Sequence, residues 1–116
     1  VLDYDEVSWR GERARQKKFF PAWVMPEEHP LVGGMAEAVN MVTGESPRIS
    51  RWSFSTNGVA TKGRHGIPTE GYAPGREELA HTTREHVRVE DLVTATAVFS
   101  LVPSVLAMLK DELSGM

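Results

Sequence analysis

The stretch that decides the fold covers residues 48–75 and reads RISRWSFSTNGVATKGRHGIPTEGYAPG. Arg48–Phe54 is short and rich in Ile, Trp and Phe, which predicts a strand. After a cluster of small polar residues, Val59–His65 is expected to form a short helix and Ile67–Ala73 a second short strand. Strand, polar loop, helix and strand in this order is the βαβ pattern, which predicts an α/β fold whose strand-end loops carry the ligand chemistry.

Helical periodicity indicates two further elements. In Pro30–Thr43 the apolar residues share one helical face, with proline suited to the first turn and Gly44 suited to the stop. From Val89 onward, apolar residues recur every seven positions, at Leu92, Phe99, Leu106 and Leu113. Pro103 interrupts this run and must kink or split the helix, so we expect it to pack on a sheet face rather than in a coiled coil.

The first thirty residues contain no helical pattern. Leu2–Trp9 carries a weak strand pattern, and the charged Gly11–Lys18 is expected to be a solvated loop. Three prolines within Phe19–Pro30 forbid a continuous helix there, which predicts an extended crossing segment at a boundary between two units.

Composition narrows the class of protein. The 116 residues suffice for one ordinary domain, and 41% apolar with 25% charged residues is globular composition, which excludes a disordered chain. Thirteen Lys and Arg against 16 Asp and Glu give a net charge of −3, so no nucleic-acid partner is expected. The absence of cysteine excludes disulfides and thiolate metal sites.

The same composition bears on location. We expect no membrane-spanning segment, because no apolar run approaches the roughly 18 residues that a span needs. No signal peptide is predicted either. We therefore expect no membrane partner and a cytoplasmic location. The chain opens at Val1 inside a patterned segment, which is typical of a fragment, with a trimmed complete protein as the alternative.

His81 is the histidine whose position favours a functional role. It follows the second predicted strand and a Pro-Gly turn, and it precedes the long helix, at the ligand-bearing edge of the predicted sheet. His29, beside Glu28, is expected to be a partnered surface group, His65 a helix C-terminal cation and His86 a solvated side chain. One histidine cannot make a zinc site, which takes three or four protein ligands.

A second candidate is the polar loop at residues 55–58. Ser55, Thr56 and Asn57 offer hydroxyl and amide groups where the first predicted strand meets the short helix, with Gly58 completing the turn. Such a loop could bind an anion or carboxylate at the helix N-terminus, and simple helix capping is the alternative.

Three segments together resemble the C-terminal part of the M-twenty family of two-metal metallopeptidases and amidohydrolases. They are FSTNGVATKGRHGIPTEGYAPG (54–75), EELAHTTREHVRVEDL (77–92) and FFPAWVMPEEHPLV (19–32). That family includes acetylornithine deacetylase, succinyl-diaminopimelate desuccinylase and aminoacylase, and the FSTNG phrase is similar to the branch linked to selenium metabolism. Order and spacing agree over nearly the whole chain, which would correspond to the last quarter to third of a member.

The resemblance implies a fold and a site. Residues 22–116 would form the C-terminal portion of a zinc-peptidase-like catalytic domain, a mixed sheet flanked by helices, and residues 1–21 the end of a dimerising lid domain. His81, in the Ala-His phrase, would be a ligand to one of two divalent metals, zinc or alternatively cobalt or manganese. The loop of Ser55, Thr56, Asn57 and Gly58 would line the site for a small-molecule amide or dipeptide substrate.

The family's other functional residues lie upstream of the matching stretch: its His-x-Asp motif, bridging Asp, general-base Glu and lid histidine. We therefore expect no catalytic residue in this chain and interpret it as a fragment of a metal-dependent hydrolase, inactive alone and prone to self-association. The resembled activity is that of an N-acyl amino acid deacylase or exopeptidase. Near His81 the chain departs from the family pattern at Thr82-Thr83, where a proline is lost, and at Arg84, an added cation. The alternative is a non-catalytic α/β binding or assembly module.

Overall fold

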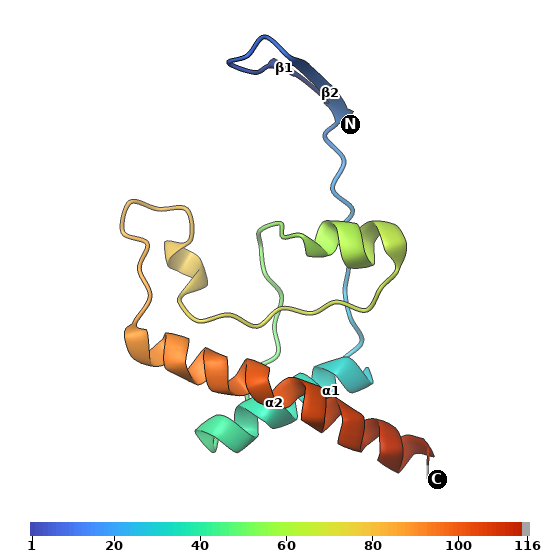
Figure 1. Ribbon diagram of the computed structural model, residues 1–116, viewed down its shortest axis with the longest axis vertical. Helices are drawn as coiled ribbons and strands as arrows, with labels where there is room; N and C mark the ends of the chain where they lie inside the picture. Colours follow the sequence, from blue (N-terminus) through green and yellow to red (C-terminus); the bar gives the residue numbers. More distant parts are fainter. Residues whose placement is uncertain (115–116) are drawn as a thin grey trace.

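The computed structural model describes residues 1–114, and the side chains of residues 1–111. Its elements are β1 (Asp3–Val7), β2 (Arg13–Lys17), α1 (Pro30–Thr43), η1 (Val59–Arg64), η2 (Glu77–Leu79) and α2 (Val89–Ser114). The β1–β2 hairpin stands apart from the helices and is joined to them by an extended segment (Figure 1). The Cα radius of gyration is 17.9 Å, whereas a compact domain of this length has about 13 Å. The described chain is therefore drawn out, with little to bury the hairpin.

The hydrophobic core lies where α1 crosses α2 (Figure 1). Ala38 and Val98 are completely buried, and Val39 and Val105 nearly so. Half-buried apolar side chains surround this cluster: Met35, Val42, Tyr72, Leu101, Val102 and Leu109. The apolar face of α1 thus packs against α2.

α1 begins and ends where the sequence predicts, because both of its termini are capped locally. The Leu31 N–H donates to Nδ1 of His29 at 3.1 Å, and proline occupies the first turn. At the other end Gly44 has a φ of 76°, the left-handed conformation that favours glycine, and its N–H donates to the Asn40 carbonyl. His29 is therefore a helix cap rather than a surface partner of Glu28.

The long helix α2 differs from its prediction in continuity and in packing. It is one continuous helix that contains Pro103, so the run is not split. Leu92 and Phe99 of the heptad set are 45% and 49% exposed, whereas Ala95, Val98 and Val105 are buried. The packed stripe follows the three- and four-residue steps of one helix crossing another, not the seven-residue repeat. Leu113 lies outside the residues whose side chains are described.

By length and composition alone, the Val89–Asp111 part of α2 could cross a membrane. The prediction that no apolar run approaches a membrane span is therefore wrong. The Thr, Ser and Pro residues within Val89–Asp111 do not lower its mean hydropathy enough to exclude a span. The core helix of a soluble protein passes the same test, and α2 packs on α1 in the described chain. Several of its apolar side chains are nevertheless exposed: Val89, Leu92, Val93, Phe99 and Met108.

The strands predicted at Arg48–Phe54 and Ile67–Ala73 are wrong for the described chain, where both segments lack regular structure and pair with no strand. A strand needs a neighbour for its backbone groups, and only the β1–β2 pair forms a ladder within the described residues. A side chain holds the first of these segments instead. The Ser53 N–H and hydroxyl both donate to Oε1 of Glu77 at 2.8 Å. The predicted mixed sheet thus stays a prediction.

β1 and β2 are antiparallel, with Asp3 opposite Lys17 and Val7 opposite Arg13. The loop predicted at Gly11–Lys18 is therefore wrong for its second half, because opposite charges across the ladder stabilise a strand there. Asp5 accepts hydrogen bonds from Nε of Arg13 at 2.6 Å and Nε of Arg15 at 3.1 Å. The Arg13 guanidinium in particular holds the pKa of the Asp5 carboxyl below its ordinary value.

Candidate functional site

His81 lies in the loop between η2 and α2, ahead of the long helix as predicted, but the strand expected to precede it does not form within the described residues. Its side chain is exposed, and its ring lies edge-on to Phe54, with centroids 6.4 Å apart and planes at 85°. The His81 N–H donates to Oε2 of Glu85 at 3.1 Å, which ties the loop to itself.

The backbone of His81 is strained. With a φ of 61°, it is the one non-glycine residue of the described chain in the left-handed region. That conformation is uncommon for a residue with a side chain, and it costs of the order of 1 kcal/mol. Such strain concentrates at functional sites, where it aims a particular side chain.

The described residues do not make a metal site by themselves. Among them there is no group of three or more His, Asp or Glu side chains placed to hold a metal ion. Zinc requires three or four protein ligands, so His81 can supply only one of a set.

The other histidines have structural or solvent-exposed positions. His65 forms the C-terminal cap position of η1, which confirms its predicted place at a helix end. His86 is exposed, as predicted, with Nδ1 2.7 Å from the Arg84 carbonyl oxygen.

The polar loop at residues 55–58 leads directly into η1. The Gly58 N–H donates to the Thr56 hydroxyl at 3.2 Å, and the Val59 N–H donates to the Thr56 carbonyl at 3.1 Å. These bonds close a turn before η1, whose first residues have no side-chain cap, while the side chains of Ser55 and Asn57 are exposed. The loop begins beside His81, because the residue before Ser55 is the Phe54 that the His81 ring contacts.

Gly58 is buried because an aromatic ring takes the place of a side chain there. A Cβ built on Gly58 would overlap the ring of Trp23, whose Nε1 donates to the Thr69 carbonyl at 2.9 Å. Pro21 similarly approaches Gly63 of η1, with its carbonyl oxygen 2.6 Å from where a Cβ would stand. The proline-rich segment is extended, as predicted, and it holds the polar loop and η1 in place.

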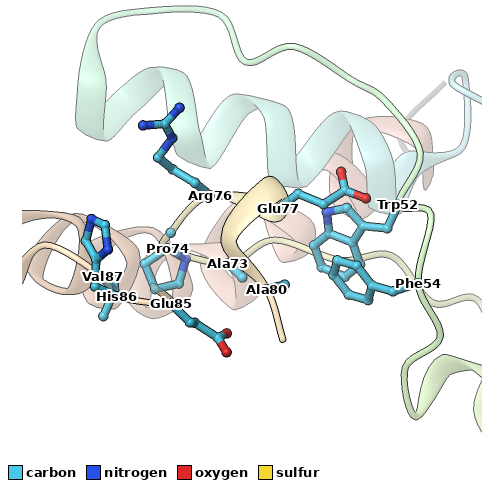
Figure 2. Close-up of a pocket in the computed structure, with 11 residues that line it drawn as sticks. Trp52, Phe54, Ala73, Pro74, Arg76, Glu77, Ala80, Glu85, His86 and Val87 are labelled. Atoms are coloured by element: carbon cyan, nitrogen blue, oxygen red, sulfur yellow. The ribbon is translucent and has the colours of Figure 1, made fainter. Parts of the chain in front are cut away.

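A hollow of about 370 Å³ adjoins the His81 loop. In Figure 2 the Trp52 and Phe54 rings lie face to face at one end of it, and His86 and Val87 lie at the other. The two rings stack with centroids 5.2 Å apart and planes at 17°. Sequence reasoning missed this hollow, although the alternating Trp-x-Phe pattern was a signal that both rings share one side of the chain.

Glu70 is another feature that the sequence did not reveal. Its Oε1 is buried without a hydrogen-bond partner, the one such side-chain atom in the described part of the chain. Burial raises the pKa of Glu70 to about 7 from an ordinary value of 4.5.

Replacing Glu70 with glutamine should flatten the pH dependence of stability. The folded state favours the protonated carboxyl of Glu70. The stability that this protonation contributes is complete below pH 4.5, the pKa in the unfolded chain, and is lost as the pH rises through about 7, the pKa in the folded chain. We expect Glu70→Gln to remove about 1 kcal/mol of the fall between about pH 5 and about pH 8, reduced from the full shift because the side chain is partly exposed.

Urea unfolding at both pH values measures this difference. Glu77→Gln is the control, because hydrogen bonds from Ser53 lower the pKa of Glu77 and its removal should leave the fall in place. A fall that Glu70→Gln does not change would contradict the prediction.

Two known proteins are similar in sequence to this chain. The uncharacterized protein YgeY of Escherichia coli strain K12 and its counterpart in strain O157:H7 are each 39% identical to this chain over 103 residues. The similarity covers 89% of this chain and 26% of each relative, so the chain spans about a quarter of their length. No family model matches the chain, and no solved structure matches it.

Proposed function

We propose that this chain contributes the C-terminal part of a metal-dependent hydrolase of amide or peptide bonds, of the M-twenty kind, and supplies one metal ligand, His81. The observation that carries the proposal is the left-handed backbone of an exposed histidine, with a φ of 61°. A glycine would adopt this conformation without strain, so the histidine stands here at a cost in stability.

The roles of the chain's residues follow from their positions. The His81 ring is open to solvent, so a ring nitrogen is accessible to a metal ion, preferably zinc. In such hydrolases the metal polarises a substrate carbonyl and activates water. The exposed Ser55 and Asn57 side chains, which lie beyond the neighbouring Phe54, would contact the acyl or carboxylate end of an N-acyl amino acid or dipeptide.

The remaining ligands and the general base are proposed to come from elsewhere in a longer polypeptide. This is supported by the chain's match to only 26% of each YgeY relative, and by the missing group of three donors among the described residues. The drawn-out shape and the two extended segments without strand partners also support this proposal.

Hydrolysis by the polypeptide translated from the complete coding sequence tests the proposal. Loaded with zinc, cobalt or manganese, it should cleave N-acyl amino acids or dipeptides. A chelator should abolish cleavage, and added metal should restore it. No metal-dependent cleavage of either substrate class would reject the proposal.

The second candidate is a non-catalytic binding or assembly module. The missing donor group favours it, as do the exposed apolar side chains of α2. It predicts a complete polypeptide that associates with a partner or with itself but neither retains metal nor hydrolyses amides, so the same assay separates the two candidates.

A further inference from the structure

We propose that the hollow walled by Trp52 and Phe54 binds a planar apolar group, such as an aromatic ring, of the molecule that is processed beside His81. The inference rests on the proposed function, because it assigns the hollow to the side chain or acyl group of that hydrolase's substrate. It adds a preference for aromatic over small aliphatic substrates.

The aromatic wall is fixed in place before any ligand arrives. Trp52 is held between the Phe54 ring, 5.2 Å away, and Gly71, where a Cβ would overlap the indole. Ser53, between the two aromatics, donates its N–H and hydroxyl to Oε1 of Glu77 at 2.8 Å each. Binding therefore needs little ordering of these side chains, which is what a preorganised site requires.

The wall is nevertheless open, since Trp52 is 40% and Phe54 36% exposed. Exposed stacked aromatics offer large apolar area and a flat face to a ligand ring. The volume of about 370 Å³ lies within the range of small-molecule sites, about 300–1,000 Å³.

Three polar side chains at the rim each make a hydrogen bond within the protein. Arg76 Nε donates to Glu78 at 2.7 Å, Glu85 accepts from the backbone of His81 at 3.1 Å, and His86 Nδ1 lies 2.7 Å from a backbone carbonyl. The apolar part of the lining is formed by Trp52, Phe54, Ala73, Pro74, Ala80 and Val87. A flat, uncharged group suits this apolar part of the lining.

The position of the hollow connects it to the candidate metal ligand. The Phe54 ring forms part of its wall and also contacts the His81 ring edge-on. A ring stacked on the aromatic wall would therefore leave the rest of its molecule within reach of His81, as a substrate side chain beside a scissile bond requires.

Binding without metal tests the inference separately from catalysis. With a chelator present, the complete polypeptide is titrated with N-acetylphenylalanine and with N-acetylalanine, and affinity is measured by calorimetry. We expect about tenfold tighter binding of the aromatic probe, the effect of stacking and apolar burial. Trp52→Leu should abolish that preference, whereas Trp9→Leu, at the exposed hairpin tip, should keep it.

Val87→Glu is a second variant, at the other end of the hollow, that leaves the aromatic stack intact and should also abolish the preference. Equal affinity for the two probes would overturn the inference. So would a Trp52 that acrylamide cannot quench in the complete polypeptide, because protein would then fill the hollow. An aromatic preference without metal-dependent hydrolysis would support binding in the hollow and reject the proposed function. Metal-dependent hydrolysis without the preference would support the proposed function and reject binding in the hollow.

Discussion

Replacing His81 with alanine in the complete polypeptide should lower its metal content and reduce amide hydrolysis about 100-fold or more. The expected loss is at least as large as that caused by removing a residue that only orients a metal ligand, about 10- to 100-fold. Metal content by mass spectrometry and kcat/KM for an N-acyl amino acid give the two readouts.

His81→Gly separates a ligand from a residue that is merely part of the loop. Glycine adopts a φ of 61° without strain, so this variant should gain about 1 kcal/mol of stability while it loses metal and activity. His65→Ala, exposed and outside the hollow, is the matched control and should change neither readout. Full metal content and activity in His81→Ala would contradict the role proposed for this residue.

Gly58→Ala should be among the most destabilising single changes in the chain. The added methyl would overlap the Trp23 ring, which is itself anchored by its hydrogen bond to the Thr69 carbonyl. Overpacking against a rigid ring costs about 1–3 kcal/mol, and here it would also dislodge the loop that leads into η1. Denaturant unfolding followed by tryptophan fluorescence measures the loss.

Gly33→Ala is the matched control, because nothing lies within 4 Å of a Cβ built at this exposed position of α1. It should be stabilising by about 0.5–1 kcal/mol, the advantage of alanine over glycine in a helix interior. Equal effects of the two substitutions would mean that Trp23 does not pack on Gly58 in solution.

Elements that depend on local signals could be predicted from the sequence. The bounds of α1 follow from proline in its first turn and from Gly44 after its end, and both residues can be identified from the sequence alone. The extended proline-rich segment and the start of η1 were predictable for the same reason. β2 was missed because its stability comes from charges across a ladder, such as Asp5 with Arg15, not from an apolar pattern.

Elements that depend on distant partners could not be predicted. The segments Arg48–Phe54 and Ile67–Ala73 have strand-like composition, yet strand pairing needs neighbours that the described chain does not supply. The packed face of α2 was misassigned because the sequence does not say whether a sheet or another helix covers it.

The candidate site likewise combines features that local sequence predicts with features that only the folded chain shows. The place of His81 in its loop followed from the turn and the helix around it, but its strained backbone and its contact with Phe54 are properties of the folded chain. The hollow brings Trp52 together with Val87 across a long stretch of sequence, and no local pattern encodes that proximity.

We propose that this chain carries one ligand of a metal site and functions only as part of a longer polypeptide. Calorimetric titration of the 116-residue chain with zinc, compared with its His81→Ala variant, tests this claim most directly. We predict that both proteins bind zinc equally weakly, because affinity comes from several convergent ligands. Tight stoichiometric binding that His81→Ala abolishes would contradict the account, since it would show a complete metal site within these residues.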